Sequence, residues 1–164
     1  MTLMKVSKLG IDLIKHFEGL KLTAYKPVPT EKYYTIGIGH YGADVKKDMA
    51  ISEKQAEELF RKDIATIETT LNKMGINFTQ NEFDALVSFI FNLGQGNFNN
   101  STLKKYILQG KSDIEICDQI IRWVNSNGKP LLGLKRRRVA EANMWLGQEK
   151  YFIKNNDKIV LKIN

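Results

Sequence analysis

The chain has 164 residues, of which 43% are hydrophobic, and it contains three prolines and one cysteine. This composition suits a single soluble globular core and excludes an intramolecular disulfide. No segment reaches the run of about 20 apolar residues that a membrane span needs. Charged residues interrupt residues 1–20, so no signal peptide is expected. The net charge of +7 favours an anionic partner, and nucleic acid, anionic lipid and bacterial wall polymers all satisfy that condition.

The N-terminal part predicts a short helix followed by a small sheet. Ser7 can cap the helix and Gly19 can end it, which places Glu18 in the last helical turn. Aromatic and β-branched residues then predict antiparallel strands at Leu22–Tyr25 and Tyr33–Ile38. The intervening segment KPVPTEK carries two prolines, which a central strand does not tolerate.

The rest of the chain predicts helices. Two capping boxes, Ser52 with Gln55 and Thr79 with Glu82, begin long helices. Glycines 75 and 94 end these helices. Shorter helices are predicted from residue 101 to about 108, from 112 to about 123 and from 131 to about 146. The pattern is typical of an α+β fold with a small lobe at about residues 20–50 and a larger helical lobe. Residues 148–164 form a tail that could be a strand, a linker or a frayed end.

Glu18 is the first candidate for chemistry. A carboxylate at a helix C-terminus lies near the negative end of the helix dipole, which disfavours its ionised form. A carboxyl group that keeps its proton near neutral pH suits general acid catalysis. The Gly-Ile-Gly run at residues 37–39 does not complete a phosphate-binding motif, and its glycines are expected to let two backbones approach in the sheet.

Four segments in order carry a family resemblance: FEGLKLTAY, YYTIGIGHYG, QNEFDALVSFIFNLGQGNFNNSTL and GLKRRRVAEANMWL. Together they resemble the motifs of phage-type lysozymes, the endolysins of glycoside hydrolase family 24, over about residues 7–147. The resemblance implies a lysozyme-like α+β catalytic domain with a cleft between the two lobes. It also implies hydrolysis of the bond between N-acetylmuramic acid and N-acetylglucosamine in peptidoglycan, without a metal or organic cofactor.

The resemblance also assigns roles to individual residues. Glu18 matches the catalytic acid, and Thr35 matches the threonine that helps to place the attacking water. Four further residues match positions that line the cleft and bind the saccharide: Tyr41, Phe91, Asn92 and Ser101.

The family's second acid is missing from this sequence. The positions where an aspartate is expected, counted from Glu18 and from Thr35, hold Pro27 and Pro29. The loop is also longer, and its VPTEK sequence resembles that of a subset of endolysins.

Three explanations for the missing base stay open. Glu31 in this loop could support the water or the developing positive charge. Thr35 with backbone groups could place the water without a second carboxylate. Finally, Asp44 or Asp48 could reach in from the following loop.

A structural rather than a catalytic role is expected for three further features. His40 is expected to be a structural partner of a carboxylate, and with only two histidines and one cysteine a metal site is not expected. Cys117 lies in an apolar setting that suits a buried side chain. The basic run at residues 135–138 is expected to form a solvated face, with the alternative that one of its cations faces Glu18 across the cleft.

The function class predicted from the sequence is a monomeric endolysin. It would accumulate in the host cytoplasm, pass the membrane through a holin pore and act on peptidoglycan, with its charge favouring anionic wall polymers. The alternative is a non-enzymatic basic module that binds the wall or nucleic acid. Nucleic acid is not the expected partner, because no basic recognition helix or aromatic stacking platform is evident.

Overall fold

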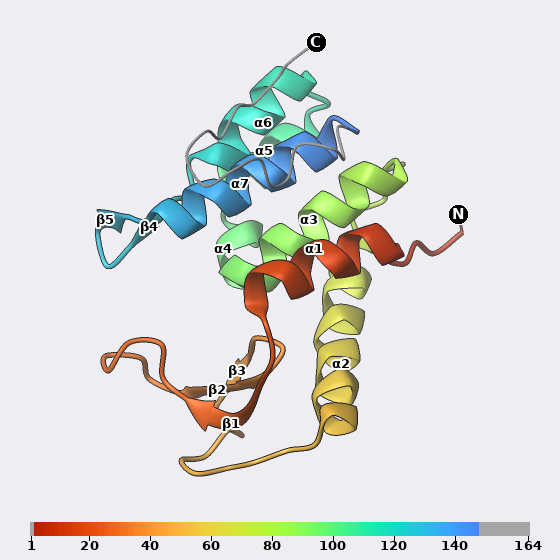
Figure 1. Ribbon diagram of the computed structural model, residues 1–164. Helices are drawn as coiled ribbons and strands as arrows, with labels where there is room; N and C mark the ends of the chain where they lie inside the picture. The colour runs from red at the N-terminus through yellow and green to blue at the C-terminus, as the bar shows by residue number, and fades with distance from the viewer. Residues whose placement is uncertain (1, 148–164) are drawn as a thin grey trace.

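The computed structural model describes residues 2–147, and the predicted tail at residues 148–164 lies outside them. The described chain has an α+β fold with a three-stranded antiparallel sheet at one end and helices at the other (Figure 1). The small lobe contains strands β1 (Lys21–Tyr25), β2 (Tyr34–Gly37) and β3 (His40–Gly42). The third strand was not predicted. The helical lobe contains α1 (Lys8–Glu18), α2 (Glu53–Asn72), α3 (Gln80–Leu93), α4 (Gln95–Asn99), α5 (Thr102–Leu108), α6 (Asp113–Ile121) and α7 (Leu132–Trp145).

The predicted helix starts are confirmed at the atomic level. Ser7 accepts a hydrogen bond from the Gly10 backbone at the start of α1. Both predicted capping boxes are formed, at the N-termini of α2 and α3. These motifs stabilise each helix where its first backbone N–H groups lack an intrahelical partner.

The core is built around α3. Its residues from Phe83 to Ile90 are all buried, and the helix packs against α1, α2 and α7. Helix α2 extends from the sheet to the other helices and so connects the two lobes (Figure 1). Because α2 contacts both the sheet and α3, it determines where the sheet lies relative to the C-terminal end of α3.

Two short elements escaped prediction. Helix α4 follows α3 directly, and a hairpin of β4 (Asn125–Ser126) and β5 (Lys129–Pro130) precedes α7. The hairpin turn holds Asn127 and Gly128, both with positive φ. This Asn-Gly pair is the residue combination that a tight two-residue hairpin favours.

Candidate functional site

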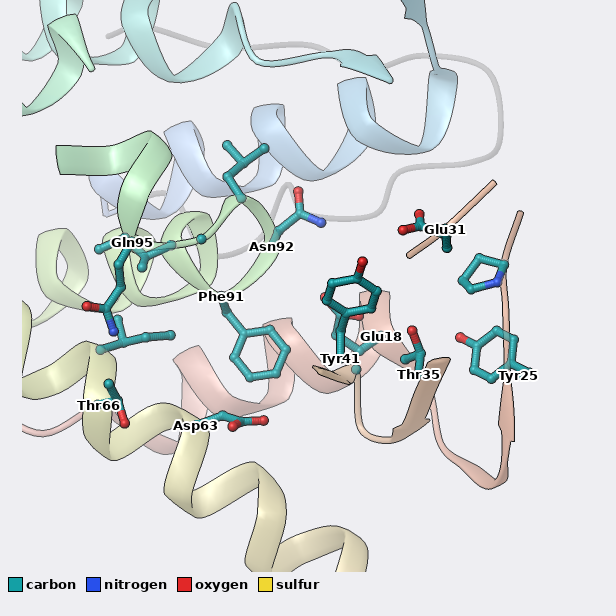
Figure 2. A pocket seen from close by; sticks show the side chains of 16 residues that line it. Glu18, Tyr25, Glu31, Thr35, Tyr41, Asp63, Thr66, Phe91, Asn92 and Gln95 are labelled. Atoms are coloured by element: carbon teal, nitrogen blue, oxygen red, sulfur yellow. The ribbon is translucent and has the colours of Figure 1, made fainter. Parts of the chain in front are cut away.

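A cavity of about 710 Å³ lies between the sheet and the helical lobe. Figure 2 shows residues from both lobes around it. The small lobe contributes Tyr25, Pro27, Glu31, Thr35, Gly39 and Tyr41, and the helical lobe contributes Glu18 at the end of α1 together with Asp63, Thr66, Ile67, Ile90, Phe91, Asn92, Leu93, Gly94 and Gln95. The predicted cleft residues of the small lobe and of α3 therefore come together in one place.

Strand pairing aligns three side chains along one wall of the cavity. Tyr25 on β1 lies opposite Thr35 on β2, and Thr35 lies opposite Tyr41 on β3. Residues directly opposite each other in a sheet project from the same face, and all three line the cavity. Thr35 is only 8% exposed whereas Tyr41 is 46% exposed, so Tyr41 forms the lip and Thr35 the floor.

Glu18 enters the cavity because α1 ends beside it. Gly19 adopts a φ of +67° that stops the helix, and the Glu18 side chain is left 19% exposed at the cavity. Its carboxylate forms a close ion pair with the guanidinium of Arg137 on α7. Arg137 therefore places a positive charge directly beside this carboxylate.

Gly39 provides the space in which the Glu18 carboxylate lies. A Cβ atom at Gly39 would lie 2.5 Å from Glu18 Oε2 and 3.0 Å from Phe91 Cε1. The glycine also has a φ of +66°, which other residues rarely adopt. The expectation that the glycines of this run serve backbone approach within the sheet is therefore wrong for Gly39, whose neighbours are side chains of α1 and α3.

The basic run at residues 135–138 is not simply a solvated face. Arg137 and Arg138 are 4% and 0% exposed, whereas Lys135 is exposed. Arg137 also donates to Glu141 Oε1 at 3.2 Å and to the Ser88 carbonyl oxygen at 3.2 Å. The alternative interpretation, a cation of this run that faces Glu18, is confirmed for Arg137.

The candidate second acids lie in different places. Glu31 lines the cavity from the lengthened loop between β1 and β2. Asp44 does not line the cavity and instead bonds His40 at 2.9 Å. Asp48 is exposed in a turn, at a φ of +64°, and does not line the cavity either.

The predicted saccharide-contacting residues separate into two groups. Phe91 and Asn92 at the end of α3 line the cavity together with Tyr41. Ser101 does not line this cavity, which is contrary to its prediction as a cleft residue. Its side chain is 8% exposed and caps α5, because Oγ donates to the Phe98 carbonyl at 2.6 Å and accepts from the Lys104 amide at 3.0 Å.

Three polar residues of the helical wall were missed by sequence reasoning. Asp63 and Thr66 lie one turn apart on α2, and Gln95 begins α4. The Gln95 side chain accepts a hydrogen bond from Thr70 Oγ1 at 2.7 Å. The spacing of Asp63 and Thr66 places them on one helical face, but nothing local in the sequence indicates that this face borders the sheet.

His40 connects the sheet to α2. Its Nδ1 lies 2.8 Å from Asp63 Oδ2 and its Nε2 lies 2.9 Å from Asp44 Oδ2. The hydrogen bond to Asp63, with that to Asp44, raises the pKa of His40 from 6.5 to about 9 against the opposing effect of burial. The prediction that His40 is a structural partner of a carboxylate is confirmed.

Cys117 and the possible metal ligands are the remaining candidates for chemistry. Burial raises the pKa of the Cys117 thiol to about 12, so this residue is not a reactive nucleophile. Within residues 2–147, no group of three or more histidine, cysteine, aspartate or glutamate side chains is arranged to hold a metal ion. No helix in the same range is long and apolar enough to cross a membrane.

Comparison with known proteins identifies the fold and its relatives. The chain is 48% identical to an endolysin of Bacillus phage PZA over 139 residues, which is 84% of this chain and 54% of that protein. It spans only 54–60% of the length of the first curated relatives that it matches.

Two solved structures resemble the fold over nearly their whole length. The endolysin of Escherichia coli O157:H7 phage FAHEc1 has a TM-score of 0.75 at 36% identity, with 88% of this chain and 95% of that chain covered. The muramidase domain of SpmX from Asticaccaulis excentricus has a TM-score of 0.75 at 33% identity, with 87% and 97% covered. Because the phage lysozyme family profile also matches residues 15–141, the chain belongs to the phage lysozyme family.

Proposed function

We propose that this chain is a peptidoglycan muramidase that acts as a phage endolysin. It hydrolyses the β-1,4 bond between N-acetylmuramic acid and N-acetylglucosamine. The observation that carries the proposal is one cavity lined by Glu18, Thr35 and Glu31. This combination supports acid-catalysed cleavage of a glycosidic bond with water as the nucleophile.

The proposed reaction needs a proton donor, a bound water and an acceptor for the proton of that water. Protonated Glu18 donates its proton to the glycosidic oxygen as the bond to the anomeric carbon breaks. The Thr35 hydroxyl holds the water that attacks this carbon. Glu31 either takes up the proton that the water releases, or stabilises the positive charge that develops on the sugar ring while that proton passes to bulk water. We further propose that the VPTEK loop marks the subset of endolysins in which the usual aspartate is absent.

The walls of the cavity suit a saccharide with mixed polarity. Phe91 and the exposed Tyr41 offer aromatic faces, while Asn92 and the α2 residues Asp63 and Thr66 offer hydrogen-bonding groups. Sugars present apolar ring faces and polar hydroxyl edges, and a few placed polar groups then fix their orientation. We assign these residues to substrate binding rather than to chemistry.

The proposed reaction is tested by the chemistry of its products. Purified bacterial walls incubated with the protein should release fragments with new reducing N-acetylmuramic acid ends, identified by mass spectrometry after borohydride reduction. New reducing ends on N-acetylglucosamine would assign the other glycosidic bond. New amino groups or free lactyl-peptides would replace the proposal with a peptidase or amidase.

We also propose that the protein reaches the wall from the host cytoplasm through a holin. Its relatives are phage endolysins, and its net charge of +7 favours adhesion to anionic wall polymers. Expression in a sensitive host should leave cells intact until a holin gene is induced. Lysis without a holin would contradict this route.

A further inference from the structure

A buried carboxylate behind the cavity, Glu141 on α7, connects two arginines to the site. Glu141 is 0% exposed. Its Oε1 accepts from Ser88 Oγ at 2.7 Å, from Arg137 Nε at 3.2 Å and from Arg138 Nη2 at 3.1 Å, and its Oε2 lies 2.9 Å from Arg138 Nε. One carboxylate therefore contacts both guanidinium groups.

Each arginine also reaches a residue that lines the cavity. Arg137 forms the ion pair with Glu18, and Arg138 Nη2 donates to Asn92 Oδ1 at 2.7 Å. Because the Asn92 oxygen is engaged in this way, its amide nitrogen is left for the cavity. Glu141 is thus connected to the proposed acid Glu18 through Arg137. It is connected to the substrate-binding amide of Asn92 through Arg138.

The cluster of Glu18, Arg137, Arg138 and Glu141 has balanced charge, with two cations and two anions. Arg137 and Glu141 are 5% and 0% exposed at their side chains, so solvent screens their interaction only weakly. Burial lowers the pKa of the Arg138 guanidinium, and Glu141 and Glu18 counteract this effect, which indicates that all of these charges interact. If Glu141 lost its charge, Glu18 would be the one carboxylate of the cluster facing two buried cations.

We propose that Glu141 is a positioning residue that neutralises part of the Arg137 and Arg138 charge so that Glu18 can hold a proton, while it fixes Asn92 through Arg138. The catalytic consequence rests on the proposed muramidase function. The effect on the protonation of Glu18 does not, because it follows from the charges of the cluster alone.

Other ionisable groups also lie near Glu18, so they must be left unchanged in every variant that is tested. Tyr25 on β1 interacts electrostatically with Glu18. Glu31 in the β1–β2 loop and Asp63 on α2 line the same cavity, and His40 on β3 is bonded to Asp63. None of them contacts Glu141 through a hydrogen bond or ion pair found among residues 2–147.

The direct test is a ¹³C NMR titration of the Glu18 carboxyl carbon without substrate, with the resonance assigned by Glu18→Gln. Glu141→Gln should move the titration midpoint to lower pH by about one unit, because Glu18 then faces an excess of positive charge. Arg138→Gln should move it in the opposite direction, because it removes a cation from the same cluster. Glu141→Asp should stay close to the wild-type midpoint.

Matched controls and a wild-type measurement keep the outcome decisive. Glu58→Gln and Arg122→Gln make the same charge changes at exposed sites outside the cluster and should leave the midpoint unchanged. If the cluster variants fail to fold, the wild-type protein still answers, because the Nε–H resonance of Arg137 should shift with the Glu18 midpoint. Equal midpoints in folded variants, or an Arg137 resonance that ignores Glu18, would overturn the proposal even if the protein cleaves peptidoglycan.

Turnover provides the functional arm of the same test. On a soluble glycan fragment, the alkaline limb of the turnover profile should move to lower pH in Glu141→Gln and to higher pH in Arg138→Gln. If Glu141 and Arg138 had only structural roles, both substitutions would reduce activity without moving the alkaline limb in opposite directions. An inactive wild-type protein with displaced midpoints would reject the muramidase proposal and retain the role of Glu141.

Discussion

Gly39 is the residue whose missing side chain matters most to the site. A Cβ atom at position 39 would lie 2.5 Å from Glu18 Oε2, and the substituted residue would have to adopt a φ of +66°. Gly39→Ala should therefore displace the carboxylate and reduce turnover by about 10²-fold, and it should cost about 1 kcal/mol in free energy of unfolding. Turnover and thermal unfolding measure the two effects. Gly96→Ala is the control, because a Cβ at Gly96 meets nothing within 4 Å.

The missing second acid is tested by a pair of substitutions with opposite expectations. If Glu31 acts as base or stabiliser, Glu31→Gln should lower turnover by about 10²-fold with wall binding intact. If Thr35 alone places the water, Thr35→Val should be the damaging change at similar side-chain volume. We favour Thr35, because it matches the family motif in place and lies on the buried floor of the cavity. An inactive, folded Glu31→Gln protein that has lost the acidic limb of its pH profile would reverse that preference.

At the residue scale, the sequence predicted the groups that belong to ordered motifs. Glu18, Thr35, Tyr41, Phe91 and Asn92 were identified in this way, and all of them line the cavity. Glu31 was identified from its loop alone and lines the cavity as well. A cation of residues 135–138 facing Glu18 was predicted only as an alternative, and the role of Glu141 was not predicted, because both depend on contacts between α7, α1 and α3 across large sequence separations.

At the element scale, Ser101 contributes to the structure of helix α5. Ser101 caps this helix rather than lining the cavity. Ser101→Ala should lower the free energy of unfolding by about 1 kcal/mol through the lost cap, and both turnover and KM should be unchanged. Chemical denaturation and steady-state kinetics test this. A raised KM with unchanged stability would restore Ser101 to the substrate-binding residues.

The contact between β3 and α2 through His40 makes stability depend on pH. The folded-state pKa of His40 is about 9 against 6.5 for a free histidine, so its stabilising contribution is complete below about pH 6.5 and is lost as pH rises through 9. The pKa of Asp44 is lowered from 3.8, chiefly by its hydrogen bond with His40. That contribution is therefore complete above about pH 4 and is lost as pH falls further.

Asp63→Asn tests this connection because it removes the main partner of His40. At pH 6 the variant should lose on the order of 2 kcal/mol of unfolding free energy, reduced from the full pKa difference by solvent screening. At pH 10 the loss should be smaller, because His40 is neutral in both proteins. Asp12→Asn disrupts an exposed pair with Lys8 and should cost less than about 0.5 kcal/mol at either pH. Equal losses for Asp63→Asn at both pH values would contradict the proposed ion pair.

At the element scale, prediction succeeded where the signal is local. The boxes at Ser52 and Thr79 fix helix starts with residues three apart, and both helices begin there. Strand β3 has three residues and helix α4 has five, which is too few for a periodic sequence pattern to indicate them. Helix α7 was predicted to present a basic face to solvent. Its Arg137 and Arg138 are instead buried, and each forms an ion pair with the buried Glu141.

At the scale of the whole molecule, the site exists because several elements converge beside α3. The end of α1 supplies Glu18, the sheet supplies Thr35, and α2 and α3 supply Asp63 and Phe91. The class of fold followed from the order of the predicted elements, since a short sheet preceded a helical remainder. The position of the cavity did not, because it requires the packing of α2 against both the sheet and α3.

The central claim is that Glu18 is the proton donor of a wall hydrolase, and its most direct test is the turnover of Glu18→Gln on purified walls. The variant should fold, because Arg137 keeps its bonds to Glu141 and to the Ser88 carbonyl oxygen. Its turnover should fall by about 10²- to 10⁴-fold, the usual contribution of a positioned general acid, while Glu58→Gln should match the wild type. A folded Glu18→Gln protein that retained half of the wild-type rate would contradict the account.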